Sequence, residues 1–422
     1  MYDQVYKSVL SKIKPNKTEQ QEQDQLTVKF VSALNKTLAQ HKAKAILGGS
    51  SAKETWLTDN KEVDIFVQFP YQQFKVKSSK LSDLLEPIIK KTFAKHSIER
   101  VHGSRDYFQI RYNNFLFEVV PILEINEAKD AINITDISPL HAKWVNKQGK
   151  KIKDEIRLAK QFCKAQQLYG AESYLNSFSG YMLEILTIHY GNFEKLLKAA
   201  VKWREPVIVD VEGYHKTKHK VFFELNKSKL HSPIIIIDPV DKYRNAAAAL
   251  SKEKFQLFKK KAKEFLDKPS TELFAEKKLD LVQLKKSKQY LVYLEMDVLE
   301  GKRDVVGAKL LKVFKHLRKE FKKYSLINAG WEWSPGESAK MYYLLKIKKL
   351  PKIEIKSGPP MKFKEHVKEF KMRNKDYYEE NGQIMAKVKI LQPKLKDFTK
   401  KAVQDKYVIE KIVKVSKVGF NF

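Results

Sequence analysis

Residues 48–55 read Gly-Gly-Ser-Ser-Ala-Lys-Glu-Thr, and residues 62–66 read Glu-Val-Asp-Ile-Phe. The first stretch follows a short apolar run, residues 45–47, and this order predicts a strand that ends in a glycine-rich turn and enters a helix. Such a turn directs backbone N–H groups and the positive end of a helix dipole outward, which suits a triphosphate. Ser50 adds a hydroxyl donor at the same place.

Three acidic residues accompany this turn. Glu62 and Asp64 are two residues apart on a predicted strand over residues 61–69, so both side chains leave the same face. Glu118 lies in the apolar segment 115–121, where a charge is costly unless something pairs with it. Carboxylate oxygens suit Mg²⁺, and two metals that flank a transferring nucleotidyl group need at least a third carboxylate. These three acids are therefore our candidate metal ligands.

The residues alone leave simpler explanations open. A Gly-Gly-Ser turn is more often only a turn, and an exposed Glu-x-Asp pair is usually a solvated strand face. Glu118 is equally compatible with a charge on an edge strand. The three features together, in the order turn, acid pair and distant strand acid, are much more specific than any one of them.

The hydrophobic pattern changes along the chain. Residues 1–42 have helical spacing, and strands then alternate with helical stretches to about residue 140. One of these predicted strands, residues 110–120, is closed by Pro121. From residue 152 the pattern is mainly helical, with one short strand over residues 234–237.

A mixed pattern of strands and helices returns beyond residue 285, of the kind that often presents a sheet to RNA. Lys268-Pro269-Ser270 predicts a boundary before it, and Gly358-Pro359-Pro360 predicts a break within it. Residues 361–422 are expected to form a basic last section.

Composition favours a polyanionic partner. The chain has 422 residues with 82 Lys and Arg against 50 Asp and Glu, a formal charge of +32. Such a surplus points first to nucleic acid, although a solvated lysine-rich surface is the simpler alternative. No apolar run approaches the roughly 18 residues that cross a membrane. The start of the chain lacks the pattern of a secretory signal, so we expect a soluble, cytoplasmic protein.

Cys163 is the single cysteine, which excludes an intrachain disulfide and a cysteine-rich zinc site. Its position within a helical pattern favours a small buried apolar residue over a nucleophile. Metal chemistry in this chain would therefore use oxygen ligands.

The glycine turn and the three acidic residues resemble those of the nucleotidyltransferase superfamily that includes poly(A) polymerases, and the match is closest to the archaeal-type, or class I, CCA-adding enzymes. The superfamily pattern of a Gly-Ser turn, a basic helix start and an acid-x-Asp strand is matched within residues 49–64. Segments 138–144, 169–172, 178–181 and 238–245 resemble those enzymes in particular. The resemblance covers most of residues 40–275 and continues more loosely to about residue 380.

The resemblance implies an α+β multidomain fold. Residues 1–140 would form a nucleotidyltransferase α/β palm with an N-terminal helix. Residues 141–275 would form a mainly helical, nucleotide-binding central domain. Residues 276–422 would form an α+β, tRNA-binding body and tail.

Carried over residue by residue, the resemblance implies that Glu62, Asp64 and Glu118 bind catalytic Mg²⁺ ions. Arg244 would face the base edge of CTP or ATP. The incoming triphosphate would contact five further residues: Ser50, Lys53, His141, Lys160 and Tyr169. Without the resemblance, the last three read as a core histidine, an exposed helix lysine and a packing aromatic, and Arg244 as a partner of Asp241.

Two positions depart from the family pattern. Glu118 stands where the family normally has Asp, and Lys53 stands where Arg is common. Glutamate reaches one methylene further, so the geometry at the metal must adjust. Lysine neutralises a phosphate as a point charge but lacks the bidentate fork of arginine.

The implied reaction is in-line attack of an RNA 3′-hydroxyl on the α-phosphate of CTP or ATP, with release of pyrophosphate. The expected partners are the 3′ acceptor end of tRNA, CTP and ATP, without a membrane, and the sequence leaves a homodimer open. Two alternatives remain: a poly(A) or oligoadenylate polymerase on the same fold, which would use only ATP, and a noncatalytic RNA-binding protein.

Overall fold

The computed structural model describes residues 2–58, 61–276, 279–351, 353–389 and 394–422. The chain divides into two compact units, Met1–Lys277 and Lys278–Phe422. The mixed α+β architecture confirms the predicted fold class, while the finer division into domains at residues 140 and 275 stays a prediction.

The first unit begins with two helices where one helical stretch was expected. Pro15 separates them, and Asn16 starts the second helix with a capping box in which Asn16 and Glu19 satisfy each other's backbone N–H groups. The first helix does not join the palm core, because its Val9 lies in the hydrophobic core of the following helical part. The two helices are α1 (Tyr2–Ile13) and α2 (Lys17–Leu38).

A five-stranded sheet of order β1-β2-β5-β4-β3 forms the palm. Strands β2 and β5 run parallel at its centre, and the other neighbouring pairs are antiparallel. Its strands are β1 (Lys44–Leu47), β2 (Glu62–Pro70), β3 (Ile98–Val101), β4 (Tyr107–Tyr112) and β5 (Phe115–Glu124). The helices that accompany them are α3 (Gly49–Ala52), α4 (Tyr71–Phe74) and α5 (Leu81–Thr92).

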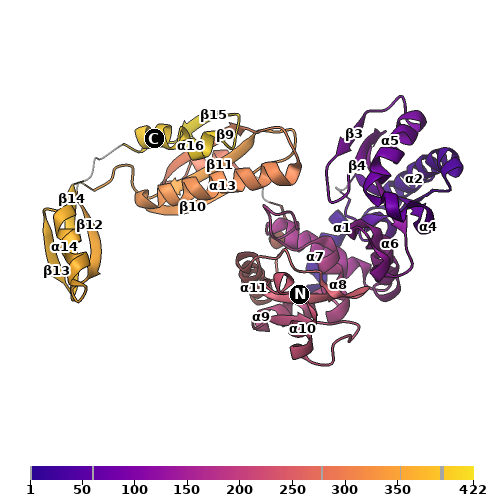
Figure 1. Cartoon of the computed structure of the whole chain (residues 1–422), viewed down its shortest axis with the longest axis horizontal. Helices are drawn as coiled ribbons and strands as arrows, with labels where there is room; N and C mark the ends of the chain where they lie inside the picture. The colour runs from indigo at the N-terminus through magenta and orange to yellow at the C-terminus, as the bar shows by residue number, and fades with distance from the viewer. Residues whose placement is uncertain (1, 59–60, 277–278, 352, 390–393) are drawn as a thin grey trace. The chain divides into compact units, whose positions relative to one another are not determined.

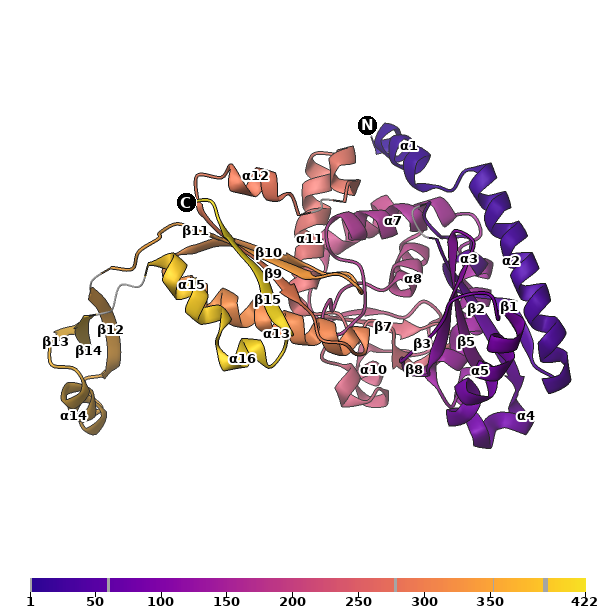
Figure 2. The same cartoon turned by 90° about the horizontal axis from the view of Figure 1, so that it is seen from above.

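Alternation along β2 and β5 decides which side chains reach the site. Val63 and Ile65 of β2, together with Phe117 of β5, are fully buried in the core that the sheet shares with α2 and α5. Residues of the opposite parity, Asp64 and Glu118 among them, leave the other face. In Figure 2, α2 runs along the palm on the side away from α8 (Gly180–Tyr190).

One predicted strand of the palm was wrong in its extent. Residues 110–120 form parts of two antiparallel strands, because Asn113 adopts a left-handed conformation and turns the chain between β4 and β5. Pro121 does not close a strand and lies inside β5. Its carbonyl accepts a hydrogen bond from Arg105 Nη1 at 3.0 Å.

The helical part of the first unit packs around one apolar core that includes Phe162, Phe178 and Phe258. Besides α8 its helices are α6 (Ser138–Gln148), α7 (Lys153–Ala165), α9 (Phe193–Lys202), α10 (Lys218–Glu224) and α11 (Lys252–Asp267). Figure 1 shows α1 among them. A small sheet has the order β6-β7-β8 and consists of β6 (Val207–Val209), β7 (Ile234–Asp238) and β8 (Asp241–Asn245). Strand β7 matches the strand expected over residues 234–237, whereas the sequence analysis did not predict β6 or β8.

The second unit is built on an antiparallel sheet of order β10-β11-β9-β15, with α13 packed against it. The mixed pattern of strands and helices expected beyond residue 285 is present in this unit. Its elements are α12 (Leu281–Lys285), β9 (Tyr290–Asp297), α13 (Arg303–Phe321), β10 (Leu326–Glu332), β11 (Ala339–Leu345), α15 (Leu395–Val403), α16 (Lys406–Ile409) and β15 (Lys414–Phe420).

Residues 361–422, expected to form one basic last section, are divided between two sheets. Strand β15 pairs with β9, and Leu395 and Val408 are buried in the same core as α13. Residues 353–389 form a small module with its own three-stranded sheet of order β12-β14-β13. Its elements are β12 (Ile353–Pro360), α14 (Lys364–Arg373), β13 (Tyr377–Glu380) and β14 (Gln383–Lys389).

Candidate active site

The glycine turn lies directly against Asp64. Gly48 N donates a hydrogen bond to the Asp64 backbone carbonyl at 2.8 Å, and the Phe66 ring occupies the space where a Gly48 side chain would be. Gly49 has a φ of +56°, and a Cβ at this position would overlap the Asp64 carboxylate. Both glycines are therefore required for the turn to approach the acidic strand this closely.

The predicted acid pair and the distant acid meet across two central strands. Asp64 of β2 is in parallel register with Glu118 of β5, so their side chains leave the same face at neighbouring positions. Gln109 Nε2 donates a hydrogen bond to Glu118 Oε1 at 2.7 Å. Glu62 is on the same strand and more exposed than Asp64. Glu118 is thus in the interior of the sheet, which contradicts the edge-strand explanation.

The electrostatic environment of Asp64 is mixed. Burial raises the pKa of its carboxyl above 3.8, and the negative charge of Glu62 adds to this rise. The positive charges of Lys53 and Lys160 oppose it. A bound cation would relieve the repulsion between the carboxylates and favour their charged form.

The chemistry of the three acidic side chains suits a hard divalent cation. Asp64, Glu118 and Glu62 offer only oxygen atoms as ligands and share one face of the sheet. Within the parts of the chain that the structure describes, no group of three His, Cys, Asp or Glu side chains is close enough together to hold a metal ion. These three residues stay our candidates for metal ligands on the grounds of register and chemistry.

Behind the turn, two lysines share one buried carboxylate that the sequence analysis missed. Lys53 Nζ and Lys160 Nζ each lie 2.7 Å from a different oxygen of Glu184 on α8. Thr55 Oγ1 donates to the same carboxylate at 3.0 Å and accepts a hydrogen bond from Lys160 Nζ at 2.8 Å. The side chains of Lys160 and Glu184 are only 4% and 1% exposed. Lys160 is therefore not an exposed helix lysine.

The charges of this cluster are coupled. Burial alone would raise the pKa of Glu184, but Lys160 and Lys53 outweigh it and lower the pKa from 4.5 to about 2. Burial lowers the pKa of Lys160 below its usual value, against the opposite influence of Glu184. Two lysines against one glutamate leave one positive charge next to the glycine turn, where a triphosphate would lie.

Tyr169 also reaches this cluster. A Cβ on Gly180, at the start of α8, would lie 2.8 Å from the Tyr169 hydroxyl. Burial, followed by the charge of Glu184, raises the pKa of the Tyr169 hydroxyl. Tyr169 is thus held in its neutral form close to Lys160. Ser50, by contrast, is half-buried within α3, and its carbonyl accepts a hydrogen bond from Thr55 N at 3.0 Å.

A second cluster forms around Asp238 at the end of β7. His141 Nε2 lies 2.9 Å from Asp238 Oδ2, and Tyr181 donates its hydroxyl to Oδ1 at 3.0 Å. Arg244 forms an ion pair with Asp238, not with the Asp241 that its spacing suggested. The rings of His141 and Tyr181 stack at 4.0 Å. The structure therefore joins His141 and Arg244 through Asp238 and Tyr181, which the sequence analysis did not single out as site residues.

Burial would raise the pKa of Asp238, but the hydrogen bond from His141 and the charges of His141 and Arg244 lower it to about 2. Burial lowers the pKa of His141, although Asp238 acts in the opposite direction. Asp238 therefore stays ionised and fixes Arg244. Lys53 Nζ lies 5.4 Å from the centroid of the Tyr181 ring, so the Asp238 and Glu184 clusters are adjacent.

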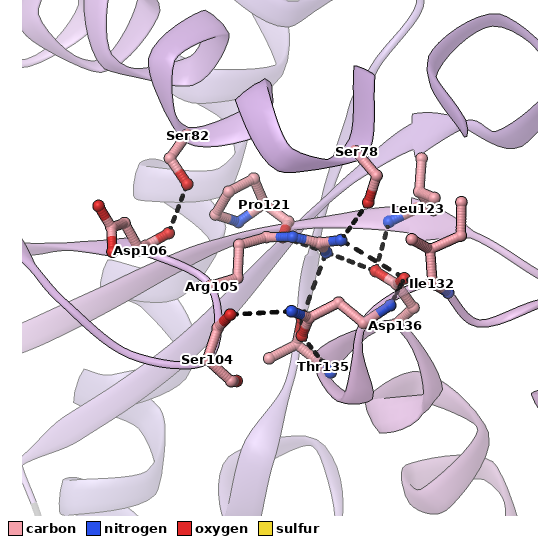
Figure 3. Close-up of polar contacts among 11 residues, drawn as sticks. Ser78, Ser82, Ser104, Arg105, Asp106, Pro121, Leu123, Ile132, Thr135 and Asp136 are labelled. Carbon is pink, nitrogen blue, oxygen red and sulfur yellow. Dashed lines mark hydrogen bonds and ion pairs between the residues drawn. The ribbon is translucent and has the colours of Figure 1, made fainter. Parts of the chain in front are cut away.

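A third network, which no local sequence signal predicted, connects β5 to the helical part. Arg105 Nη1 forms a buried ion pair with Asp136 at 2.5 Å, and its Nη2 donates to Ser78 Oγ at 2.7 Å (Figure 3). Asp136 in turn accepts a hydrogen bond from Leu123 N at 2.9 Å (Figure 3). This network holds the end of β5 beside the segment that leads into α6.

Two families match parts of this chain. Residues 1–158 match the family described as Second Messenger Oligonucleotide or Dinucleotide Synthetase domain, and residues 154–275 match that described as tRNA nucleotidyltransferase, second domain. A solved structure described as a cytoplasmic RNA terminal U-transferase superposes with a TM-score of 0.50 and 14% identity, covering 66% of this chain and 99% of that one. This likeness shows a shared nucleotidyltransferase fold. No helix of the described residues is long and apolar enough to cross a membrane.

Several CCA-adding enzymes are similar to this chain in sequence. A CCA-adding enzyme of Nanoarchaeum equitans is 43% identical over 51% of this chain. This match covers 54% of that relative, about half of its length. CCA-adding enzymes of Methanosarcina mazei and Pyrococcus abyssi are 30% and 32% identical over 86% and 85% of this chain, which covers 80% and 81% of them. Since these matches extend over both compact units, the chain belongs to the family of CCA-adding enzymes.

Proposed function

We propose that this chain adds CMP, CMP and AMP to the 3′ end of tRNA, with CTP and ATP as substrates and pyrophosphate as the product. Membership of the CCA-adding enzymes supports the activity. The observation that carries the proposal within the structure is the register of Asp64 with Glu118 directly beneath the glycine turn.

The candidate residues would have different roles, which follow from their chemistry. Asp64, Glu118 and Glu62 would hold Mg²⁺, which would lower the pKa of the attacking 3′-hydroxyl and stabilise charge on the leaving oxygens. Lys53 and Lys160 supply positive charge for the triphosphate, and Glu184 fixes their positions. The backbone N–H groups of the turn and Ser50 are placed to donate to phosphate oxygens.

Nucleotide choice would rest on Arg244. Its side chain is 25% exposed, and its ion pair with the buried Asp238 fixes the guanidinium while leaving further N–H donors for a base. Guanidinium N–H groups in fixed positions can donate to acceptor atoms of cytosine and adenine and discriminate against uracil and guanine. His141 and Tyr181 would support this position by holding the other side of Asp238.

The experiment that tests the proposal is incubation of the protein with a tRNA that lacks CCA, Mg²⁺ and each nucleoside triphosphate separately, followed by sequencing of the 3′ ends. The proposal expects CMP addition with CTP alone and completion of CCA with CTP and ATP together. Addition of AMP alone would assign the chain to the poly(A) polymerases. No addition under any condition would support a noncatalytic RNA-binding protein.

A further inference from the structure

A cavity lies in the first unit, outside the candidate active site. It encloses about 690 Å³, which is within the range of roughly 300 to 1,000 Å³ usual for ligand sites. The end of the palm, α6, Tyr214 and the segment from Val240 to Tyr243 line it. Among the described residues, none of the nine side chains that we assign to the active site lines this cavity. It is therefore a separate space.

Helix α6 separates the two sites. Leu140, Lys143, Trp144 and Lys147 line the cavity, and their spacing of three and four residues puts them on one face of the helix. His141 leaves from another face and contacts Asp238. One helix thus serves both sites with different side chains.

The aromatic walls of the cavity are fixed by hydrogen bonds at their polar ends. Trp144 Nε1 donates to Glu212 Oε1 at 2.7 Å, and the Tyr214 hydroxyl donates to the Pro239 carbonyl at 2.6 Å. Tyr243 is 53% exposed, and Lys242 Nζ lies 4.9 Å from its ring centroid. These bonds hold the Trp144 and Tyr214 rings in place, whereas Tyr243 is the most exposed of the three rings and is therefore the one that can offer a face to a base.

The charge of the cavity is positive. Four lysines and two acidic residues line it, so 4 − 2 gives a net charge of +2. Lys129 pairs with Glu127 at 2.5 Å, whereas Lys143 and Lys147 are exposed and form no ion pair with the described residues. Aromatic faces next to unpaired ammonium groups are the combination that binds nucleotides of a single strand, with bases on rings and phosphates on lysines.

We propose that this cavity binds one nucleotide of a single-stranded RNA segment. The base would stack on Tyr243, and the flanking phosphates would lie against Lys143 and Lys147. This assignment rests on the proposed function in one respect, because the strand would be the 3′ end of the RNA substrate.

The cavity also has a direct connection to the active site. Val240, which lines the cavity, donates its backbone N–H to Asp238 Oδ1 at 3.0 Å. Asp238 is the residue that fixes Arg244. A nucleotide bound against Val240 would therefore lie close to the segment that positions the base-selecting arginine.

The charge assignment is tested by RNA binding without any nucleoside triphosphate. Each phosphate contact to a single strand contributes about 0.7 to the slope of log affinity against log salt, so Lys143→Gln with Lys147→Gln should reduce the slope by about 1.4. A matched control is Lys260→Gln with Lys263→Gln, two exposed lysines of α11 that do not line the cavity. The control should leave the slope unchanged. Equal slopes for both double variants would overturn the assignment.

The stacking assignment is tested at Tyr243 with tRNA that lacks CCA. Tyr243→Ala should weaken binding of this RNA about tenfold, and Tyr243→Phe, which keeps the ring, should restore it. Binding of a blunt-ended duplex of the same length should not change in either variant. Equal losses for duplex and single-stranded ends would overturn the proposal. Free AMP that binds in a Tyr243-dependent way while tRNA binding is unaffected would also overturn it.

These binding results are independent of catalysis. A protein that adds no nucleotides but shows the expected changes would overturn the proposed function and leave the cavity assigned. A protein that adds CCA normally but binds RNA equally well in every variant would overturn the cavity assignment alone.

Discussion

Lys53 and Glu184 form a buried ion pair at 2.7 Å between the end of the glycine turn and α8. Lys160 occupies the other carboxylate oxygen at the same distance. Three charges that lie far apart in the sequence thus form one unit. The pair connects the element that would receive a triphosphate to the helical part of the same compact unit.

Glu184→Gln should destabilise the protein by about 3 kcal/mol, because it leaves the buried Lys160 without its counter-ion. The Michaelis constant for CTP should rise as well, since Lys53 and Lys160 lose their common anchor. Urea unfolding and initial rates check these two effects. Glu194→Gln is a matched control, because Glu194 pairs with Lys198 on the surface and its loss should cost under about 1 kcal/mol.

The pH dependence of the stability lost in Glu184→Gln identifies the cause of that loss. The folded pKa of Glu184 is lowered from 4.5 to about 2, so its stabilising contribution is complete above about pH 4.5. The contribution is lost as the pH falls through the folded pKa. The difference in unfolding free energy between wild type and Glu184→Gln should therefore shrink below about pH 4.5. A difference that is the same at pH 6 and pH 3 would show that the effect is not electrostatic.

Arg244→Ala should lower the rates with CTP and ATP by about tenfold to a hundredfold, the usual effect of removing hydrogen bonds from a charged donor. It should also relax the rejection of UTP. Single-nucleotide incorporation with each triphosphate measures both effects. Arg204→Ala, which removes an exposed arginine that belongs to neither the candidate active site nor the cavity, is the control. If the incorporation ratios stay as in wild type, Arg244 is only a structural partner of Asp238.

The acidic strands could be predicted because their signal is local. Alternation along β2 and β5 identifies the face of Asp64 and Glu118 from a few residues each. Glu184 carries the same signal, an acid within the apolar run of residues 182–186, yet its partners come from another part of the chain. An acidic residue within an apolar helical run indicates a buried charge in the same way as one within an apolar strand. This signal could have identified Glu184.

Long-range pairing limited the rest of the prediction. Strand β15 pairs with β9 more than a hundred residues away, and no local pattern distinguishes such a strand from a basic tail. The same holds for Arg105 and Asp136, whose ion pair joins two separate segments. The turn at Asn113 was missed because apolar alternation continues on both sides of it.

Residues 353–389 should be removable as a module. Lys349 forms an antiparallel bridge with Lys394, and Leu395 N donates to the Lys348 carbonyl at 3.0 Å, so the chain leaves and returns at one place. Replacement of the module by a short Gly-Ser linker should change stability by about 1 kcal/mol or less, since loop length has a weak effect.

Truncation after residue 389 is the contrasting variant. It removes β15 and the buried Leu395 and Val408, so the second unit should lose its cooperative unfolding transition. Circular dichroism during thermal unfolding compares the two variants. Equal stability of both variants would mean that β15 does not belong to the sheet of order β10-β11-β9-β15.

Glu118→Gln should lower CMP and AMP addition by at least about a hundredfold, because a neutral amide cannot replace an anionic oxygen beside Mg²⁺. Glu118→Asp should keep measurable activity and need more Mg²⁺, since its carboxylate is shorter by one methylene, roughly 1.5 Å. Rates against Mg²⁺ concentration for both variants, after circular dichroism shows equal folding, check this prediction. Near-normal turnover of Glu118→Gln would remove Glu118 from the site.

The central claim is that Asp64 serves catalysis and not RNA binding. The decisive measurement is CMP addition to tRNA lacking CCA by Asp64→Asn, together with the affinity of this variant for the same tRNA. Glu124→Gln neutralises an exposed acid at the end of β5 and is the control. We expect addition at background level for Asp64→Asn, normal addition for the control, and tRNA affinities within about threefold of wild type. Retained CMP addition by a folded Asp64→Asn protein would contradict this claim.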